Sequence, residues 1–333
     1  MRKTTALATT FLLFFAWLSP HKLSAQETQP DALEIYVEQV RVDVHVLHKG
    51  KPVPGLTKND FEVCEDGVPQ EIKSVLDNYP LSIAVVVDQS GSTKRVFEDA
   101  RNASRSILDL LSAEDEVAVV GFDHTARTIY PLTAKMEAGN QKNSLEATLR
   151  RMENTEGGTS LNAGITLAIN VLRDVRGHKR KVIILISDNE DGYVLMQNDG
   201  TAKEINITNA EAKRTTKLAV ESEVSVYNVR IGKNRYENNN APAPPGMRFV
   251  RRLAQETGGQ IIDARGKKDP SPSLLQILFR LKNTYSIFYA PVDLEKIGLR
   301  KIRVELKHNP RSKWPPFQKK YELISRKEYF FKK

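Results

Sequence analysis

The sequence has a single cysteine, Cys64, so no disulfide can form within the chain. Its stability must come from a buried core, and 333 residues with 40% hydrophobic composition can build one. We expect Cys64 to be a small buried side chain, with an intermolecular bridge as the alternative. Catalytic signatures are also missing, because no GxSxG elbow, Walker phosphate loop or GxGxxG turn occurs. Nothing in these patterns indicates a serine hydrolase or a nucleotide-dependent enzyme.

Long apolar runs are absent except near the start. Arg2 and Lys3 precede an apolar run at 6–18, and a short polar stretch then reaches small residues ending at Ala25. This is the pattern of a secretory signal peptide, and the run is shorter than the ~20 residues that span a bilayer. We expect cleavage after Ala25 and a secreted or periplasmic protein, with a membrane anchor as the alternative.

Acidic residues are scarce at the end of the chain. Residues 298–333 carry twelve Lys/Arg and three Glu, whereas 26–297 is slightly acidic, in a chain of net charge +9. The basic segment is either the solvated face of strands or a contact for an anionic surface. It contains no aromatic-and-basic motif of a nucleic-acid-binding module, so we expect no nucleic acid partner.

The hydrophobic pattern divides the chain into segments. After the signal peptide at 1–25, residues 33–78 alternate as short strands do. Residues 79–290 alternate apolar runs with helical spacing, which predicts an α/β fold: a doubly wound, mostly parallel sheet with helices on both faces. Residues 291–333 predict further strands between prolines. We expect the two flanking β segments to pack together as one small module, because each alone is small.

Within the α/β segment the pattern predicts six strands and six helices. The expected strands are 81–88, 116–123, 127–132, 181–188, 224–232 and 260–265. The expected helices are 94–112, 141–152, 161–175, 208–222, 247–257 and 271–284.

Polar residues follow the carboxyl ends of the predicted strands, where ligands bind in open α/β sheets. Asp88, Ser90 and Ser92 follow the first buried strand, Thr159 precedes a helix, and Asp188 ends a third buried strand. Carboxylate and hydroxyl oxygens are hard donors that suit Mg²⁺, Mn²⁺ or Ca²⁺. Any one cluster alone is explained by ordinary helix capping. Three such clusters, in this order and at the ends of these strands, favour a metal site.

These motifs resemble a known family. VVVDQSGS, GGTSLNAG and LISDNEDG resemble the metal-ion-dependent adhesion site of von Willebrand factor type A domains, over about residues 79–290. The resemblance implies a Rossmann-like fold, direct metal binding by Ser90 and Ser92, and binding by Thr159 directly or through water. Asp88 and Asp188 would act through waters. Asn189 stands where many members have glycine, which could alter the turn but not the ligand.

The flanks resemble a narrower group. GKPVPGLTKNDFEVCEDGVPQEI and YSIFYAPV with LRKIRVELK are similar to a bacterial exported "VWFA-related" group, known from acidobacteria and without a defined common activity. The resemblance implies a fold and a metal, not a partner.

We expect a binding protein rather than an enzyme. Its metal would be completed by a carboxylate from a protein or envelope ligand. Two alternatives stay open: a structural or assembly role in which the metal only stabilises loops, and a metal-assisted hydrolase. We expect Glu190 and Asp191 to be solvated loop residues and His124 to lie in a surface loop. The loop 233–246 either shapes partner choice or is a simple insertion.

Overall fold

The computed structural model describes residues 39–134, 141–155, 157–175, 179–197, 201–232, 242–267, 269–307 and 321–331. A six-stranded sheet runs in the order β13-β12-β9-β6-β7-β8, parallel except for β8 at one edge. Its strands are β6 (Leu81–Asp88), β7 (Glu116–Phe122), β8 (Ala126–Ala134), β9 (Arg180–Ser187), β12 (Val224–Arg230) and β13 (Ile261–Asp263). Every residue of β6 is buried, as expected for a strand covered on both faces.

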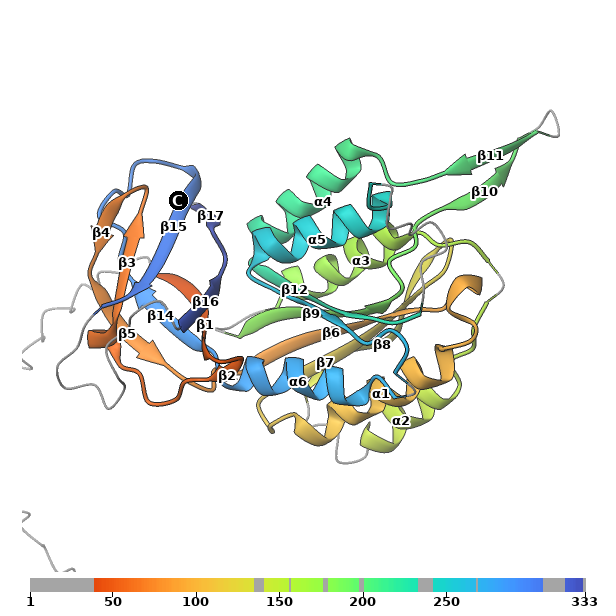
Figure 1. Ribbon diagram of the computed structural model, residues 1–333, viewed down its shortest axis with the longest axis horizontal. Helices are drawn as coiled ribbons and strands as arrows, with labels where there is room; N and C mark the ends of the chain where they lie inside the picture. The colour runs from red at the N-terminus through yellow and green to blue at the C-terminus, as the bar shows by residue number, and fades with distance from the viewer. Residues whose placement is uncertain are drawn as a thin grey trace, which may run out of the picture. The chain divides into compact units, whose positions relative to one another are not determined.

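Helices cover both faces of this sheet (Figure 1). One face packs against α1 (Phe97–Leu110), α2 (Gln141–Arg150) and α6 (Ser271–Lys282). The other packs against α3 (Leu161–Arg173), α4 (Asn209–Glu221) and α5 (Pro245–Thr257). The predicted fold class, a mostly parallel α/β sheet with helices on both faces, is confirmed.

The first helix begins later than its apolar spacing predicts. A 3₁₀ turn, η2 (Gly91–Thr93), follows β6, and α1 starts only at Phe97. The Thr93 hydroxyl donates to the backbone oxygens of Asp88 (3.1 Å) and Ser90 (2.9 Å), which holds the turn closed against the strand end. Periodicity alone could not place the start of α1, because Val96, which precedes the helix, packs against the same core as the helix does.

The flanking segments pair with each other, as predicted, in two antiparallel sheets around a shared core. One sheet contains β1 (Val40–His48), β2 (Lys51–Pro52), β5 (Ile72–Leu76), β14 (Tyr285–Tyr289) and β16 (Tyr321–Ser325). The other contains β3 (Phe61–Glu65), β4 (Val68–Gln70), β15 (Gly298–Leu306) and β17 (Glu328–Phe331), with η1 (Lys58–Asp60) before β3. We call these two sheets the β module.

The α/β unit is inserted into the β module. Strand β14 pairs with β1 and β5, so it belongs to the module, although the sequence pattern placed it within 79–290. Asp115 fastens the two ends of the inserted unit: it accepts hydrogen bonds from the Leu81 amide (2.9 Å) and the Lys282 ammonium (2.5 Å).

One hairpin was not predicted. Strands β10 (Tyr193–Met196) and β11 (Ala202–Ile205) pair only with each other and project from the sheet edge at which β9 ends (Figure 1). Each strand is short and exposed where described, so no apolar alternation marks it.

Some expectations fall outside the described residues: the signal peptide at 1–25, residues 233–241 of the long loop, and 308–320 of the basic segment. Cys64 is buried, as predicted. Arg300 is also buried, so the described part of the basic segment is not simply a solvated face. Among the described helices, none has an apolar stretch long enough to cross a bilayer.

Candidate metal site

Asp88 is the last residue of the central strand and is fully buried. Its Oδ1 accepts hydrogen bonds from the Ser90 amide (3.0 Å) and the Ser90 hydroxyl (2.5 Å). Its Oδ2 accepts one from the Ser187 hydroxyl (2.7 Å), on neighbouring β9. The carboxylate is therefore oriented by hydroxyl and amide donors from two adjacent strand ends.

The two serines of the D-x-S-x-S motif lie beside this carboxylate. The Ser90 and Ser92 hydroxyl oxygens are 3.1 Å apart, and the Ser92 hydroxyl lies near enough to Asp188 to lower the pKa of that carboxyl. Ser90 is buried and Ser92 is exposed, so the cluster opens toward solvent on the Ser92 side. The structure thus brings Asp88, Ser90, Ser92 and Asp188 close together.

Asp188 is buried with one side-chain oxygen left over. Its Oδ1 accepts from the Glu190 amide (2.8 Å), whereas Oδ2 is buried and has no hydrogen-bond partner in the described part of the chain. Burying a hydrogen-bond acceptor without a partner costs free energy. The unpaired Asp188 Oδ2 therefore indicates that a ligand binds this oxygen.

The electrostatics of the pair support this conclusion. Burial raises the pKa of Asp88 above its ordinary range, and the neighbouring Asp188 charge adds to that rise. Burial also raises the pKa of Asp188, against the hydrogen bond from the Glu190 amide, the nearby Ser92 hydroxyl and a weaker attraction from Arg230. Two buried carboxylates that repel each other are stabilised by a bound cation.

Asn189 keeps the turn that glycine usually provides. Its backbone φ is +61°, in the left-handed region, which asparagine tolerates better than most residues. Its amide donates to the Ser187 hydroxyl (2.9 Å), and its side-chain Nδ2 donates to Asn228 Oδ1 (2.9 Å). The departure from glycine therefore leaves Asp188 at the strand end.

Thr159 is buried on the loop that lies against the serine turn. The Gly91 amide donates to the Gly157 carbonyl (3.1 Å), which joins the two loops. Thr159 exchanges two backbone hydrogen bonds of 2.8 Å with Gly192, at the root of the β10–β11 hairpin. Among the described residues, no side-chain hydrogen bond joins Thr159 to Asp88, Ser90, Ser92 or Asp188, and the contact between their loops is made by backbone groups.

The residues present fit a hard divalent cation. The donors are carboxylate and hydroxyl oxygens, two negative charges have no ion-pair partner in the described residues, and the Asp188 Oδ2 acceptor is unpaired. The described residues contain no group of three or more His, Cys, Asp or Glu that could hold a metal, so a site of the zinc type is not found there.

Two expectations about the neighbouring acids were wrong. Glu190 and Asp191 were expected to be solvated, but both are buried. Asp191 Oδ1 accepts from the Leu161 amide (3.0 Å) and Oδ2 accepts from the Ile207 amide (2.5 Å). Asp191 therefore connects the Asp188 loop to the starts of α3 and α4. The sequence gives no sign of this role, because an acidic residue in a loop is usually exposed.

Sequence reasoning also missed Ser187 and Asn154. The Asn154 side-chain nitrogen donates to the carbonyls of Gln89 (3.0 Å) and Ser90 (2.7 Å) and so fixes the serine turn from a distant segment. His124 is exposed beside Asp123, with a ring nitrogen 3.3 Å from that carboxylate, as expected of a surface loop.

Part of the chain matches a known family. The von Willebrand factor type A domain family matches residues 83–190. The pig inter-alpha-trypsin inhibitor heavy chain H2 is 24% identical over 204 residues, which are 60% of this chain and 20% of that protein. An uncharacterised Synechocystis protein is 27% identical over 117 residues, covering 34% of this chain and 26% of its own.

Among solved structures, a von Willebrand factor type A protein from Catenulispora acidiphila is similar. It has a TM-score of 0.49 and 14% identity, over 78% of this chain and 72% of its own. The chain spans only about a fifth to a quarter of the length of the curated relatives it matches. The matched segment, residues 83–190, carries all five candidate site residues, and it is similar to a von Willebrand factor type A domain.

Proposed function

We propose that this protein is an exported, metal-dependent binding module rather than an enzyme. Asp88, Ser90, Ser92, Thr159 and Asp188 would hold Mg²⁺, with Mn²⁺ or Ca²⁺ as the other candidates. When bound, the ion supplies a positive charge that accepts a carboxylate from a protein or envelope ligand. The basic C-terminal segment is a further candidate contact for an anionic surface.

One observation carries this proposal: two mutually repelling carboxylates are surrounded by neutral hydroxyls, and an acceptor of Asp188 is left unpaired. Hydroxyl ligands do not neutralise an ion, so a metal held here would keep charge for an external carboxylate. The exposed Ser92 lies on the side from which such a group could approach.

A structural role is the second candidate, and the backbone bonds between Thr159 and Gly192 favour it. A metal that drew the serine turn and the Thr159 loop together would also stiffen the root of the hairpin. The two functions separate when stability and partner binding are measured on the same variants.

The test is calorimetric titration of Mg²⁺, and then of Ca²⁺, into the EDTA-stripped chain and into Ser90→Ala/Ser92→Ala. The matched control is Ser104→Ala/Ser225→Ala, which removes two hydroxyls that bond backbone carbonyls away from the cluster. We expect saturable binding in the parent and control chains and none in the Ser90/Ser92 variant. Equal binding in all three would place the metal elsewhere.

Pull-down of envelope extracts in Mg²⁺ and in EDTA then tests the binding role. A partner retained only in Mg²⁺, and lost with the Ser90/Ser92 variant, supports a metal-completed interface. If the variant loses stability but keeps its partner, the metal serves the structural role instead.

A further inference from the structure

A hollow of about 260 Å³ lies between the starts of α4 and α5. Three cationic side chains line it: Lys213 from α4, and Arg248 and Arg252 from α5. Thr208 and Asn209 add polar groups at the start of α4. The hollow is thus positively charged and large enough for a few side-chain carboxylates.

The positive charge of the hollow is largely uncompensated. Among the described residues, no carboxylate forms an ion pair with Lys213 or Arg248, and Arg252 pairs with Glu256 (2.6 Å) one turn along α5. The nearby acid, Glu211, is turned back to cap α4, accepting from the Thr208 amide (2.9 Å) and hydroxyl (2.7 Å).

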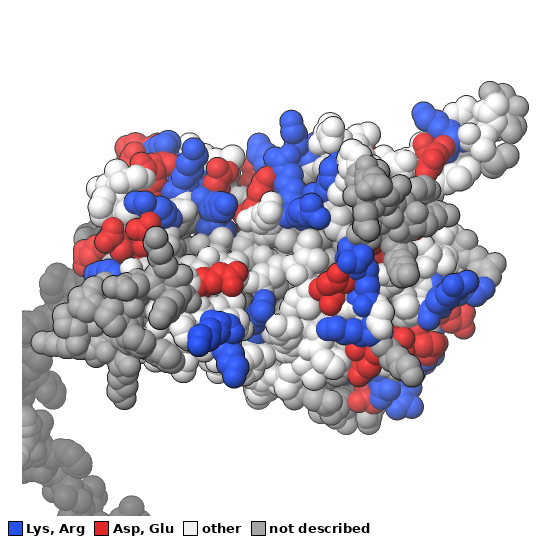
Figure 2. Space-filling model, in the orientation of Figure 1, with Lys and Arg blue, Asp and Glu red and all other residues white. Residues whose placement is uncertain are grey.

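Further cations extend this surface. Arg214, Lys217 and Arg251 are exposed on the same two helices. Figure 2 shows Lys and Arg gathered over α4 and α5 in this view. Such a local field attracts anionic groups and speeds their encounter.

The hollow adjoins the candidate metal site through one loop. The Ile207 amide, at the edge of the hollow, donates to Asp191 (2.5 Å), three residues after Asp188. At the start of α5, a Cβ added to Gly246 would lie 2.5 Å from the Asn189 oxygen and 3.0 Å from the Asp191 Cβ. The loop 188–191 therefore contacts residues at the edge of the hollow and also carries Asp188 of the candidate metal site.

We infer that the partner is an acidic polypeptide that binds both places. One of its carboxylates completes the metal, and further carboxylates pair with Lys213, Arg248 and Arg252. This inference rests on the proposed function. Arginine forks bind carboxylates through two parallel hydrogen bonds, and two linked contacts bind more tightly than either alone.

The lining of the hollow favours an acidic polypeptide over a sulfated polymer. It includes Phe249, Ala212 and Pro245, apolar surface that suits the stems of amino-acid side chains. Residues 26–297 are slightly acidic as a whole, so the cationic hollow is a local feature of this part of the chain.

The test is binding of a fluorescein-labelled oligoglutamate peptide to the full chain, measured by anisotropy in Mg²⁺ and in EDTA. The variant is Lys213→Gln/Arg248→Gln/Arg252→Gln. The matched control is Lys58→Gln/Lys73→Gln/Lys301→Gln, which removes the same charge from exposed residues of the β module. With ~0.2–1 kcal/mol for each exposed pair, we expect about tenfold weaker binding in the variant at low salt, and no change in the control.

The outcomes separate this inference from the proposed function. If Mg²⁺ has no effect but the variant still binds more weakly than the control, the hollow stands and the metal role fails. If Mg²⁺ strengthens binding equally in the variant and the control, the metal role stands and the hollow is rejected. Tighter binding of dextran sulfate than of oligoglutamate at equal charge, lost in the variant, would overturn the assignment to a polypeptide.

Folding of the variant is checked by circular dichroism. The three replaced side chains are exposed, so we expect an unchanged spectrum and midpoint. Should the triple variant not fold, Arg248→Gln gives the same test, because its guanidinium bonds only the Ala243 carbonyl in the described residues. Binding equal to that of the parent chain would then reject the hollow.

Discussion

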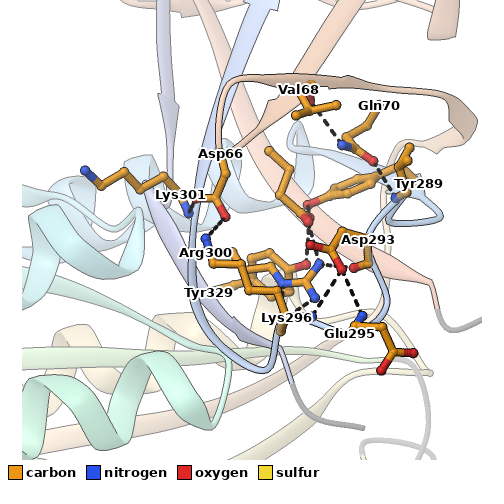
Figure 3. A network of polar contacts seen from close by, with 12 residues as sticks. Asp66, Val68, Gln70, Tyr289, Asp293, Glu295, Lys296, Arg300, Lys301 and Tyr329 are labelled. Carbon is orange, nitrogen blue, oxygen red and sulfur yellow. Dashed lines mark hydrogen bonds and ion pairs between the residues drawn. The ribbon is translucent and has the colours of Figure 1, made fainter.

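Two buried acidic centres in this molecule are completed in opposite ways. In the β module, Glu65 accepts from Arg300 (2.6 Å) and from the hydroxyls of Tyr289 (2.7 Å) and Tyr329 (2.6 Å) (Figure 3). Arg300 also donates to the carbonyls of residues 293 and 296, and lies 3.8 Å from the ring centre of Phe331. Every charge in this network has a partner within the chain.

In the centre formed by Asp88 and Asp188, no cation forms an ion pair with either carboxylate among the residues that the structure describes. Its donors are hydroxyls and amides, and one Asp188 oxygen has no partner in the described residues. We call the Glu65 network closed, because its polar groups are paired within the chain, and the Asp88–Asp188 centre open, because one acceptor is not. A closed network stabilises the fold, whereas an open one can bind a ligand. The difference teaches that burial of an acid says little about function until its partners are counted.

The largest expected effect is on the closed network. Glu65→Gln leaves the buried Arg300 without its counter-charge, so we expect a loss of about 3–5 kcal/mol in the free energy of unfolding. Urea denaturation monitored by circular dichroism measures it. A loss below 1 kcal/mol would mean that Arg300 finds enough compensation in the backbone carbonyls alone.

The same neutralisation at the open centre should have the opposite sign. Asp188→Asn removes a buried charge beside Asp88 and keeps an acceptor for the Glu190 amide, so in EDTA we expect a gain of about 1–2 kcal/mol. In saturating Mg²⁺ the variant should gain no further stability. Destabilisation in EDTA would contradict our account of repulsion between the two carboxylates.

His45 provides a third case, a buried group kept neutral. It bridges the module and the α/β unit: Nε2 lies 2.6 Å from the Tyr227 hydroxyl, and Nδ1 lies 2.9 Å from the Thr284 hydroxyl. Burial, and then the charge of Arg180, lowers its pKa from 6.5 to about 4, against the charge of Asp43.

Between pH 6.5 and 4, His45 is protonated in the unfolded chain but stays neutral in the folded chain. The free energy of unfolding therefore falls as the pH drops from 6.5 toward 4. We expect this group to cost about 2 kcal/mol by pH 5 relative to neutral pH. Denaturation of the parent chain and His45→Gln between pH 5 and 7.5 measures the difference. Parallel pH profiles would show that His45 does not supply this acid sensitivity.

The smallest effect probes one bond of the closed network. Tyr329→Phe removes one of two hydroxyls that donate to Glu65 Oε2, so we expect a loss of about 1 kcal/mol. Tyr289→Phe is the matched variant, because it removes the other donor. Denaturation of both variants and of the double variant tests whether the two hydroxyls substitute for each other. A double loss larger than the sum would support that.

Strands and helices with uniform periodicity, and the strand ends that meet in a parallel sheet, were predictable from sequence, whereas individual side-chain contacts between distant segments were not. The run at 81–88 predicts a strand covered on both faces, and every residue of β6 is buried. The strand ends also predict that Asp88 and Asp188 meet, because β6 and β9 are parallel neighbours. By contrast, nothing local marks Asp191 as the tie between two helix starts, or Arg300 as a buried cation. Their partners lie many residues away in the sequence, and the local hydrophobic pattern carries no information about such contacts.

The insertion of the α/β unit also sets an order for folding. Strand β1 is synthesised early, but its partners β14 and β16 follow only after the whole inserted unit, since Val40 pairs with Tyr289 and Val44 pairs with Ser325. Closing so long a loop is slow in a disordered chain. Once Asp115 has accepted its hydrogen bonds from Leu81 and Lys282, the two ends of the α/β unit are held together, and the loop between β1 and β14 is effectively short. The nascent chain must therefore complete the α/β unit before β1 can pair with β14 and β16.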